Sequence, residues 1–227
     1  MKKSKNNKTW QEKIKIIKKN IPWLERCPFI RTVLISGSLA RGQASEDSDI
    51  DLFVIFKKNH IFTGRFFLVL RSKFLTYPKG KDKSKFCLNH FCTDSLESIS
   101  EKNPYTAFLM THFLPIIDDG YFFYFKKKNA WSKEFFPDGN LQKDCNRKPI
   151  KSNLEIFLEK KLISFLAEKF FEAAQRLKIF LNPATHKKGA KIIVSKKEIA
   201  LHPEPKSEAF IREFEKTNFG KAKPSDR

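Results

Sequence analysis

The stretch LISGSLARG (residues 34–42) precedes SDIDL (residues 48–52), with a short polar segment between them. Residues 30–35 form an apolar run rich in β-branched side chains that stops at Ser36, and residues 49–56 show a second strand pattern. The Gly-Ser pair that follows the first run is typical of a turn. The sequence therefore predicts two neighbouring strands joined through a turn and a polar loop.

Asp49 and Asp51 are two residues apart on the second predicted strand. Side chains alternate between the two faces of a strand, so both carboxylates leave the same face. Two negative charges this close repel each other unless a cation lies beside them. Carboxylate oxygens are the ligands that Mg²⁺ prefers. The pair therefore predicts a magnesium site, which would make sense beside a triphosphate.

The turn at Gly37 and Ser38 has the composition of a phosphate-binding loop. Glycine permits close approach of the backbone to a ligand and unusual dihedral angles. Ser38 offers a hydroxyl and an amide N–H at a predicted helix N-terminus, where phosphate oxygens bind well. Arg41, three residues later, can reach a phosphate or clamp the turn. We therefore expect the phosphates of a nucleotide at this turn.

Together these segments resemble the signature of the DNA polymerase β-like nucleotidyltransferase superfamily, in which an apolar strand, Gly-Ser and a loop precede Asp-x-Asp on the next strand. The resemblance covers residues 34–54. It implies an enzyme that moves a nucleoside monophosphate from a nucleoside triphosphate to a hydroxyl acceptor. It also implies two Mg²⁺ ions on the catalytic residues Asp49 and Asp51, and nucleotide binding by Gly37, Ser38, Arg41 and Ser48.

The same resemblance implies a third carboxylate on a later strand, and here the sequence departs from the pattern. The strand predicted at residues 85–93 contains no Asp or Glu. Asn89 is a candidate neutral ligand, and Asp94 or Asp82 is a candidate acid at an end of the strand. Because an amide cannot act as a general base, Asn89 would leave proton removal to the metal, to His90 or to the substrate phosphates. Alternation places His90 opposite Asn89, where a packed or hydrogen-bonded histidine is the commoner outcome.

The order strand, turn, strand, helix, strand predicts an α/β (α+β) fold with a nucleotidyltransferase-type core, in which helices flank a small mixed β-sheet and a helical C-terminal region follows. A polar stretch places a domain boundary near Ile150. The predicted parts are a catalytic domain with an N-terminal helix at 1–150 and a helical region with a flexible end at 151–227. Apolar periodicity predicts helices at 9–20, 62–77, 105–113, 153–181 and 206–219, and a short apolar run lies at 192–194.

The chain carries 45 basic and 25 acidic residues, a net charge of +20 that favours a polyanionic partner. Only nine of the basic residues are arginine, so a compositional excess of lysine also explains the charge. We expect a nucleoside triphosphate substrate and an RNA or tRNA end as the acceptor. The alternatives are a small-molecule (antibiotic-type) acceptor, or a catalytically impaired relative that binds nucleotide or RNA without turnover.

The sequence favours a cytoplasmic protein with no membrane partner. Its apolar runs fall short of the roughly 20 residues that a membrane helix needs. The N-terminus lacks the apolar stretch of a signal peptide. The four cysteines are scattered and form no Cys-x-x-Cys pair, which is consistent with free thiols in a reducing compartment. Nothing in the sequence predicts the oligomeric state.

Overall fold

The computed structural model describes residues 2–73, 86–137, 145, 147–202 and 207–219. In these residues the strands form a six-stranded mixed sheet of order β4-β1-β2-β3-β6-β5. β2 and β3 run parallel, and the other neighbours are antiparallel. The predicted mixed sheet is therefore confirmed. The strands are β1 (Ile30–Ile35), β2 (Ile50–Phe56), β3 (Phe86–Thr93), β4 (Leu114–Asp118), β5 (Lys191–Val194) and β6 (Glu198–His202).

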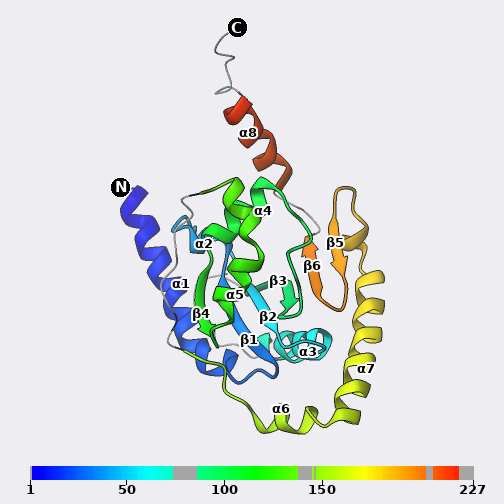
Figure 1. Ribbon diagram of the computed structural model, residues 1–227. Coiled ribbons are helices and arrows are strands. Elements are labelled where there is room, and N and C mark those ends of the chain that lie inside the picture. The colour runs from blue at the N-terminus through cyan, green and yellow to red at the C-terminus, as the bar shows by residue number, and fades with distance from the viewer. Residues whose placement is uncertain (1, 74–85, 138–144, 146, 203–206, 220–227) are drawn as a thin grey trace.

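Helices surround this sheet, as Figure 1 shows, with α4 and α5 in front of it and α7 beside the β5–β6 edge. None of the described helices combines the length and apolarity that crossing a membrane requires. The helices are α1 (Lys2–Leu24), α2 (Gly37–Ala40), α3 (Ile61–Ser72), α4 (Pro104–Thr111), α5 (Tyr121–Lys128), α6 (Asn153–Leu158), α7 (Lys161–Phe180) and α8 (Ser207–Phe219), with 3₁₀ turns at Ala130–Glu134 and Pro183–His186.

Strand alternation divides the core into two layers. Val54 of β2 packs with residues of α1 and α3 on one face of the sheet. Phe53 and Ile55 pack with residues of α4 and α5 on the other face. Asp51 shares the odd parity of Phe53, so it begins the face that α4 covers. The alternation that buries the core thus also directs the Asp51 carboxylate toward α4, whereas Asp49, predicted as part of this strand, lies just before it.

Several helix boundaries differ from the prediction, among them the end of α3 at Ser72 rather than 77, and two of the differences affect the packing. α1 continues through Pro22 to Leu24, because a proline in the last turn removes only one helical hydrogen bond and the final turn buries Leu24 in the core. The single helix predicted at 153–181 is broken at Glu159 and Lys160 into α6 and α7. The break lets α7 turn and pack against α3.

A β-hairpin in the C-terminal region was not predicted. The apolar run at 192–194 belongs to β5, and β6 follows it and pairs with β3. The sheet therefore continues across position 150, although α6, α7 and α8 supply the predicted helices of this region. β6 begins with Glu198, which is 1% exposed, and a buried acid is not part of a strand pattern.

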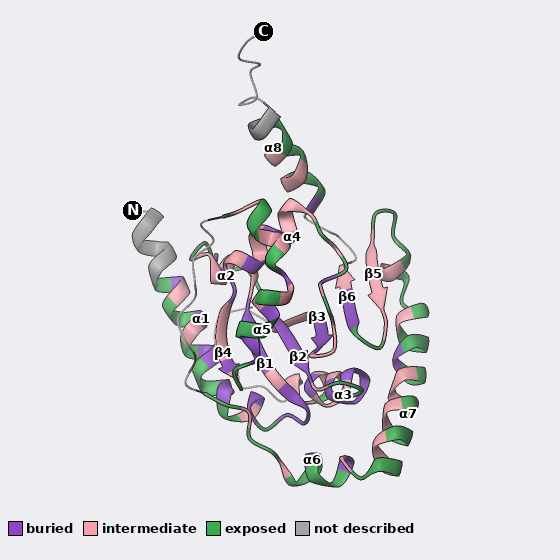
Figure 2. Ribbon diagram, viewed as in Figure 1, coloured by how far each residue is buried: buried purple, intermediate pink, exposed green. Residues whose placement is uncertain are grey.

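The aromatic run that begins α5 belongs mainly to the core. Tyr121, Phe122 and Phe125 are buried, whereas Phe123 and Tyr124 are 66% and 59% exposed. In Figure 2 the ribbon of α5 accordingly carries the colours of both buried and exposed residues. Buried and exposed residues alternate along α5 as they do in a helix that packs one face on a sheet.

Candidate functional site

A cavity of about 370 Å³ lies between the sheet and α4. Residues from both halves of the sequence motif line it, namely Gly37, Ser38, Ser48, Asp49 and Asp51. The structure therefore brings the turn and the two carboxylates together at one opening. Asp49 is exposed and Asp51 is half-buried, so both are accessible from the cavity.

Gly37 and Asp51 are in direct contact. A Cβ atom placed on Gly37 would lie 2.0 Å from Asp51 Oδ2 and 2.9 Å from its Cγ. Gly37 also has φ +66°, in the left-handed region that glycine adopts without penalty. The backbone N–H of Ser36 donates to the carbonyl oxygen of Asp51 at 2.9 Å. Glycine is therefore required here both for the backbone conformation and for the space that the carboxylate occupies.

Helix α1 holds both sides of the motif in place. The indole N–H of Trp10 donates to the carbonyl of Leu39 in α2 at 3.1 Å. The ammonium of Lys13, which is 1% exposed, donates to the carbonyl of Ser48 at 2.6 Å. A buried ammonium needs such partners to offset its lost hydration. α1 is therefore part of the support of the site.

Arg41 clamps the turn. Its Nε donates to the carbonyl of Gly37 at 3.2 Å, and its guanidinium lies 5.4 Å from the ring centre of Phe108. Arg41 is not among the residues that line the cavity. Of the two roles considered from the sequence, the structure shows the clamp. Since α2 has only four residues, its dipole is small. A phosphate at this site would therefore depend on hydrogen bonds from the backbone N–H groups of the turn itself.

Asn89 lies where a third ligand is expected. β2 and β3 are in register with Asp51 opposite Cys87, and both Cys87 and Asn89 line the cavity. The Asn89 amide nitrogen donates to Cys87 Sγ at 2.9 Å. This contact uses the nitrogen, so the amide oxygen is the atom that can face a cation.

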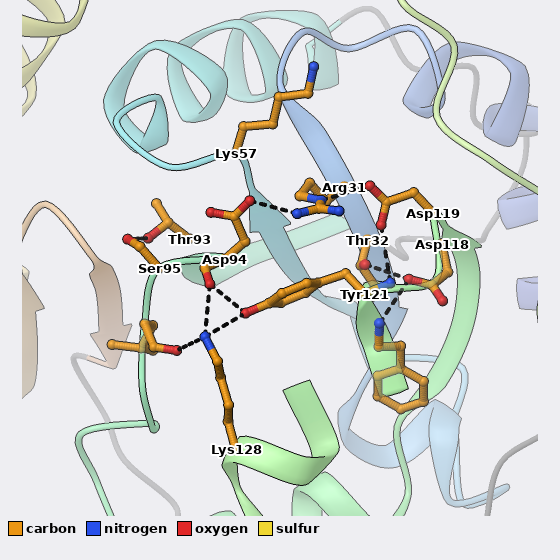
Figure 3. Close-up of polar contacts among 12 residues, drawn as sticks. Arg31, Thr32, Lys57, Thr93, Asp94, Ser95, Asp118, Asp119, Tyr121 and Lys128 are labelled. Atoms are coloured by element: carbon orange, nitrogen blue, oxygen red, sulfur yellow. Dashed lines mark hydrogen bonds and ion pairs between the residues drawn. The ribbon is translucent and has the colours of Figure 1, made fainter. Parts of the chain in front are cut away.

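The alternative acids are not placed with the pair. Asp94 follows the far end of β3, where its carboxylate accepts a hydrogen bond from Arg31 at 2.8 Å. Figure 3 shows Asp94 among Arg31, Tyr121 and Lys128. Asp94 is therefore excluded as a ligand beside Asp51, because a parallel β3 carries its C-terminal end away from the start of β2. Asp82 lies outside the described residues.

His90 shares the cavity with Asn89, which corrects the assignment from alternation. The register between β2 and β3 changes from Asp51 opposite Cys87 to Phe53 opposite His90, so β3 contains an extra residue at this point. Such a bulge interrupts the alternation of faces. The imidazole Nε2 lies 2.9 Å from Glu198 Oε1, so His90 is hydrogen-bonded as expected.

Several cavity residues had no signal in the sequence. Glu101 lines the cavity and accepts a hydrogen bond from Lys191 at 2.5 Å. Burial raises the pKa of the Tyr105 hydroxyl and lowers the pKa of His202 to about 4, so both groups are neutral near pH 7. These residues come from α4, the loop before it and β6. Only the tertiary packing of distant segments brings them to the motif.

The oxygen donors of the site fit a hard cation bound together with a triphosphate. Within the described part of the chain, no three His, Cys, Asp or Glu side chains cluster as a metal site. Asp49, Asp51 and the Asn89 amide oxygen are nevertheless the donor type that Mg²⁺ takes. Mg²⁺ commonly uses one or two carboxylates and completes its shell with water and substrate phosphates. The set therefore suits an ion held jointly by protein and nucleotide.

Glu198 supports the cavity wall and gives a pH-dependent prediction. Burial raises the pKa of this carboxyl, but hydrogen bonds from His90 and Ser100 outweigh burial and hold the pKa below 4.5. A depressed folded-state pKa means that the stabilisation is present above pH 4.5 and is lost as the pH falls through the folded-state value. We expect Glu198→Gln to lower the free energy of unfolding by about 1–3 kcal/mol near pH 7.

Urea unfolding at a series of pH values measures this effect. The difference in free energy between the wild-type protein and Glu198→Gln is expected to shrink as the pH falls below 4.5. A difference that stays constant from neutral to acidic pH would mean that the Glu198 carboxylate contributes nothing as a charged group.

Comparison with protein families matches residues 15–86 to the family described as Polymerase beta, Nucleotidyltransferase. The matched segment contains β1, the Gly37 turn, β2 and α3. It thus extends beyond residues 34–54, which carry the resemblance in the sequence. The corresponding comparisons with curated proteins and with solved structures gave no match.

Proposed function

We propose, from the match of residues 15–86 to the polymerase β nucleotidyltransferase family, that the protein transfers a nucleoside monophosphate from a nucleoside triphosphate to a hydroxyl acceptor. The observation that carries the proposal is the contact between the Gly37 turn and the Asp51 carboxylate at a shared cavity. A phosphate bound by the turn would lie beside that carboxylate. Nucleotidyl transfer requires this proximity of phosphate and acid.

Each part of the motif has a role in this proposal. The amides and hydroxyl at Gly37 and Ser38 hold phosphate oxygens, and Asp49, Asp51 and Asn89 would hold Mg²⁺. When bound there, Mg²⁺ supplies charge neutralisation and lowers the pKa of the attacking hydroxyl. The acceptor oxygen forms a bond to the α-phosphorus of the nucleotide, and the bond from that phosphorus to the leaving oxygen breaks. The proton of the acceptor hydroxyl passes to a phosphate oxygen of the substrate, and pyrophosphate departs.

An RNA end is the acceptor that we propose. The net charge of +20 favours a polyanion, because basic side chains release counterions from phosphates. The cavity also offers the exposed Asp49 at its edge, so an acceptor end can approach the carboxylates from solvent. A small-molecule acceptor is the competing outcome of the experiment that follows.

Transfer of label tests the proposal. The purified chain is incubated with Mg²⁺ and each α-labelled nucleoside triphosphate, together with cellular RNA or with a small-molecule extract. We expect label in RNA, released by nuclease, and loss of the signal in Asp49→Ala. Asn89→Asp serves as a matched variant, because it adds the missing carboxylate without changing side-chain size. It is expected to keep transfer and to lower the Mg²⁺ concentration that is needed. Absence of label in every pool contradicts the proposed transfer.

Asn89 also favours a second candidate function, in which the protein binds nucleotide or RNA without turnover. An amide cannot accept the proton of the acceptor hydroxyl. In this case a triphosphate raises the thermal unfolding temperature without release of pyrophosphate. Transfer that arises in Asn89→Asp, but is absent from the wild-type protein, would favour this second function over the first.

A further inference from the structure

Helix α7 is attached to the domain through its inner face. The Glu168 carboxylate accepts hydrogen bonds from the backbone N–H groups of Phe62 and Thr63 at 3.0 and 2.9 Å. Gln175, 6% exposed, donates to the carbonyl of Phe62 at 2.7 Å and accepts from Arg65 at 2.6 Å. These polar contacts fix which face of α7 looks inward. The opposite face is therefore turned away from the rest of the domain.

That outer face is apolar along the whole helix. We call six of its residues the α7 stripe: Leu162, Leu166, Phe170, Ala173, Leu177 and Leu181. The five large side chains of the stripe are 55–70% exposed, and Figure 2 shows most of α7 as exposed surface. Together they present on the order of several hundred Å² of apolar surface, a patch size that marks interaction sites. This surface exceeds what a solvated helix face carries.

The spacing of the residues in the α7 stripe is the same from either end of the helix. Its members are separated by intervals of four, four, three, four and four residues. The outer positions are leucine at each end, and the inner pair joins the large Phe170 to the small Ala173. Such a pattern is self-complementary when a second helix runs in the opposite direction. A bulky ring then lies over an alanine, and leucine lies over leucine.

The charged residues beside the stripe are held within their own subunit. The Glu172 side chain is 14% exposed and accepts a hydrogen bond from Arg176 at 3.1 Å. The Arg176 guanidinium also lies 5.6 Å from the ring centre of Phe62 and donates to the carbonyl of Val194 at 3.2 Å. The apolar side chains of the stripe are therefore the surface that α7 offers to a second copy.

We propose that two copies of this protein pair through α7, antiparallel about a two-fold axis that passes between residues 171 and 172. Leu162 then contacts the partner's Leu181, and Leu166 contacts the partner's Leu177. The same patch serves both subunits, as in two-fold dimers generally. The exposed apolar area of one helix is comparable to the roughly 800 Å² per partner of a stable interface. The net charge of +20 opposes association, so salt strengthens the dimer.

Sedimentation velocity on the full chain over a wide concentration range tests the proposal. We expect a reversible dimer, and a dissociation constant raised by about 100-fold or more in Leu166→Glu/Leu177→Glu, because charges replace the apolar contacts. Phe123→Glu is the matched control, since Phe123 is 66% exposed but lies on α5. It is expected to leave the dimer intact. Circular dichroism checks that each variant keeps its helix content.

An exchange of Phe170 and Ala173 tests the two-fold register itself. Ala173→Phe is expected to weaken the dimer, because two bulky rings then meet across the axis. The double variant Phe170→Ala/Ala173→Phe is expected to bind more tightly than Ala173→Phe, since a ring again lies over an alanine. A wild-type monomer at every concentration, or a dimer unaffected by Leu166→Glu/Leu177→Glu, overturns the proposal. A monomer that binds vesicles of anionic lipid overturns it and assigns the stripe to a membrane surface.

Discussion

Replacement of Asp51 by alanine is expected to abolish nucleotidyl transfer, with a loss of about 1,000-fold or more. Asp51 is the carboxylate that contacts the Gly37 turn, and no other described acid joins it and Asp49 as a cluster of three. Its removal leaves too few protein ligands beside the phosphates for a divalent ion. Transfer of label from a triphosphate measures the loss. Thermal unfolding is expected to show a folded protein, because Asp51 is only half-buried.

Asp94→Asn is the control for this variant. Asp94 is also an acid next to a strand of the central sheet, but it pairs with Arg31 at the far end of β3. We expect this change to lower the free energy of unfolding by about 1 kcal/mol and to keep transfer within a few-fold of the wild type. Equal losses of transfer in both variants would show that Asp51 has no special role.

Gly37→Ala is expected to remove transfer almost completely while the chain still folds. The new methyl group would lie 2.0 Å from Asp51 Oδ2, so the carboxylate must leave its position beside the turn. The backbone conformation at φ +66° adds about 1–2 kcal/mol of strain for any residue with a Cβ. The clash displaces a flexible side chain, so we expect the activity to suffer far more than the stability. Label transfer and urea unfolding measure the two effects separately.

Gly42→Ala separates strain from clash. Gly42 has φ +68°, nearly the same as Gly37, but a Cβ there would meet no atom within 4 Å. Its loss of stability should therefore resemble the strain at Gly37, whereas transfer should remain close to that of the wild type. If Gly42→Ala inactivates the protein as strongly as Gly37→Ala, backbone strain rather than the displaced Asp51 carboxylate explains the effect.

The motif and its strands could be predicted because the relevant interactions are local. β1 was predicted at its observed bounds, since an apolar run that ends in Ser-Gly-Ser has few alternative conformations. Strand parity predicted Asp49 and Asp51 on one face; Asp51 lies on the face of β2 that α4 covers, and Asp49 lies just before β2 but lines the same cavity. Gly37 was expected to allow close approach of the backbone, and the atom that approaches it is Asp51 Oδ2.

The rest of the site depends on packing between distant segments. The bulge in β3 turns both Asn89 and His90 toward the cavity. No residue type in that strand predicts a bulge. β6 starts with the buried Glu198, whose carboxylate is hydrogen-bonded to His90 and Ser100 from other segments. The turn before it, Ser195 to Lys197, lacks the glycine or asparagine that signals a hairpin. The break before α7 has no proline or glycine at all.

The most direct test of the central claim is calorimetric binding of a non-hydrolysable nucleoside triphosphate with and without Mg²⁺. This measurement needs no knowledge of the acceptor. We predict that Mg²⁺ strengthens binding in the wild-type protein and has no effect in Asp51→Ala, and that Gly37→Ala weakens binding in both conditions. Binding that is independent of Mg²⁺ and unchanged in both variants would contradict a shared phosphate and metal site at the Gly37 turn.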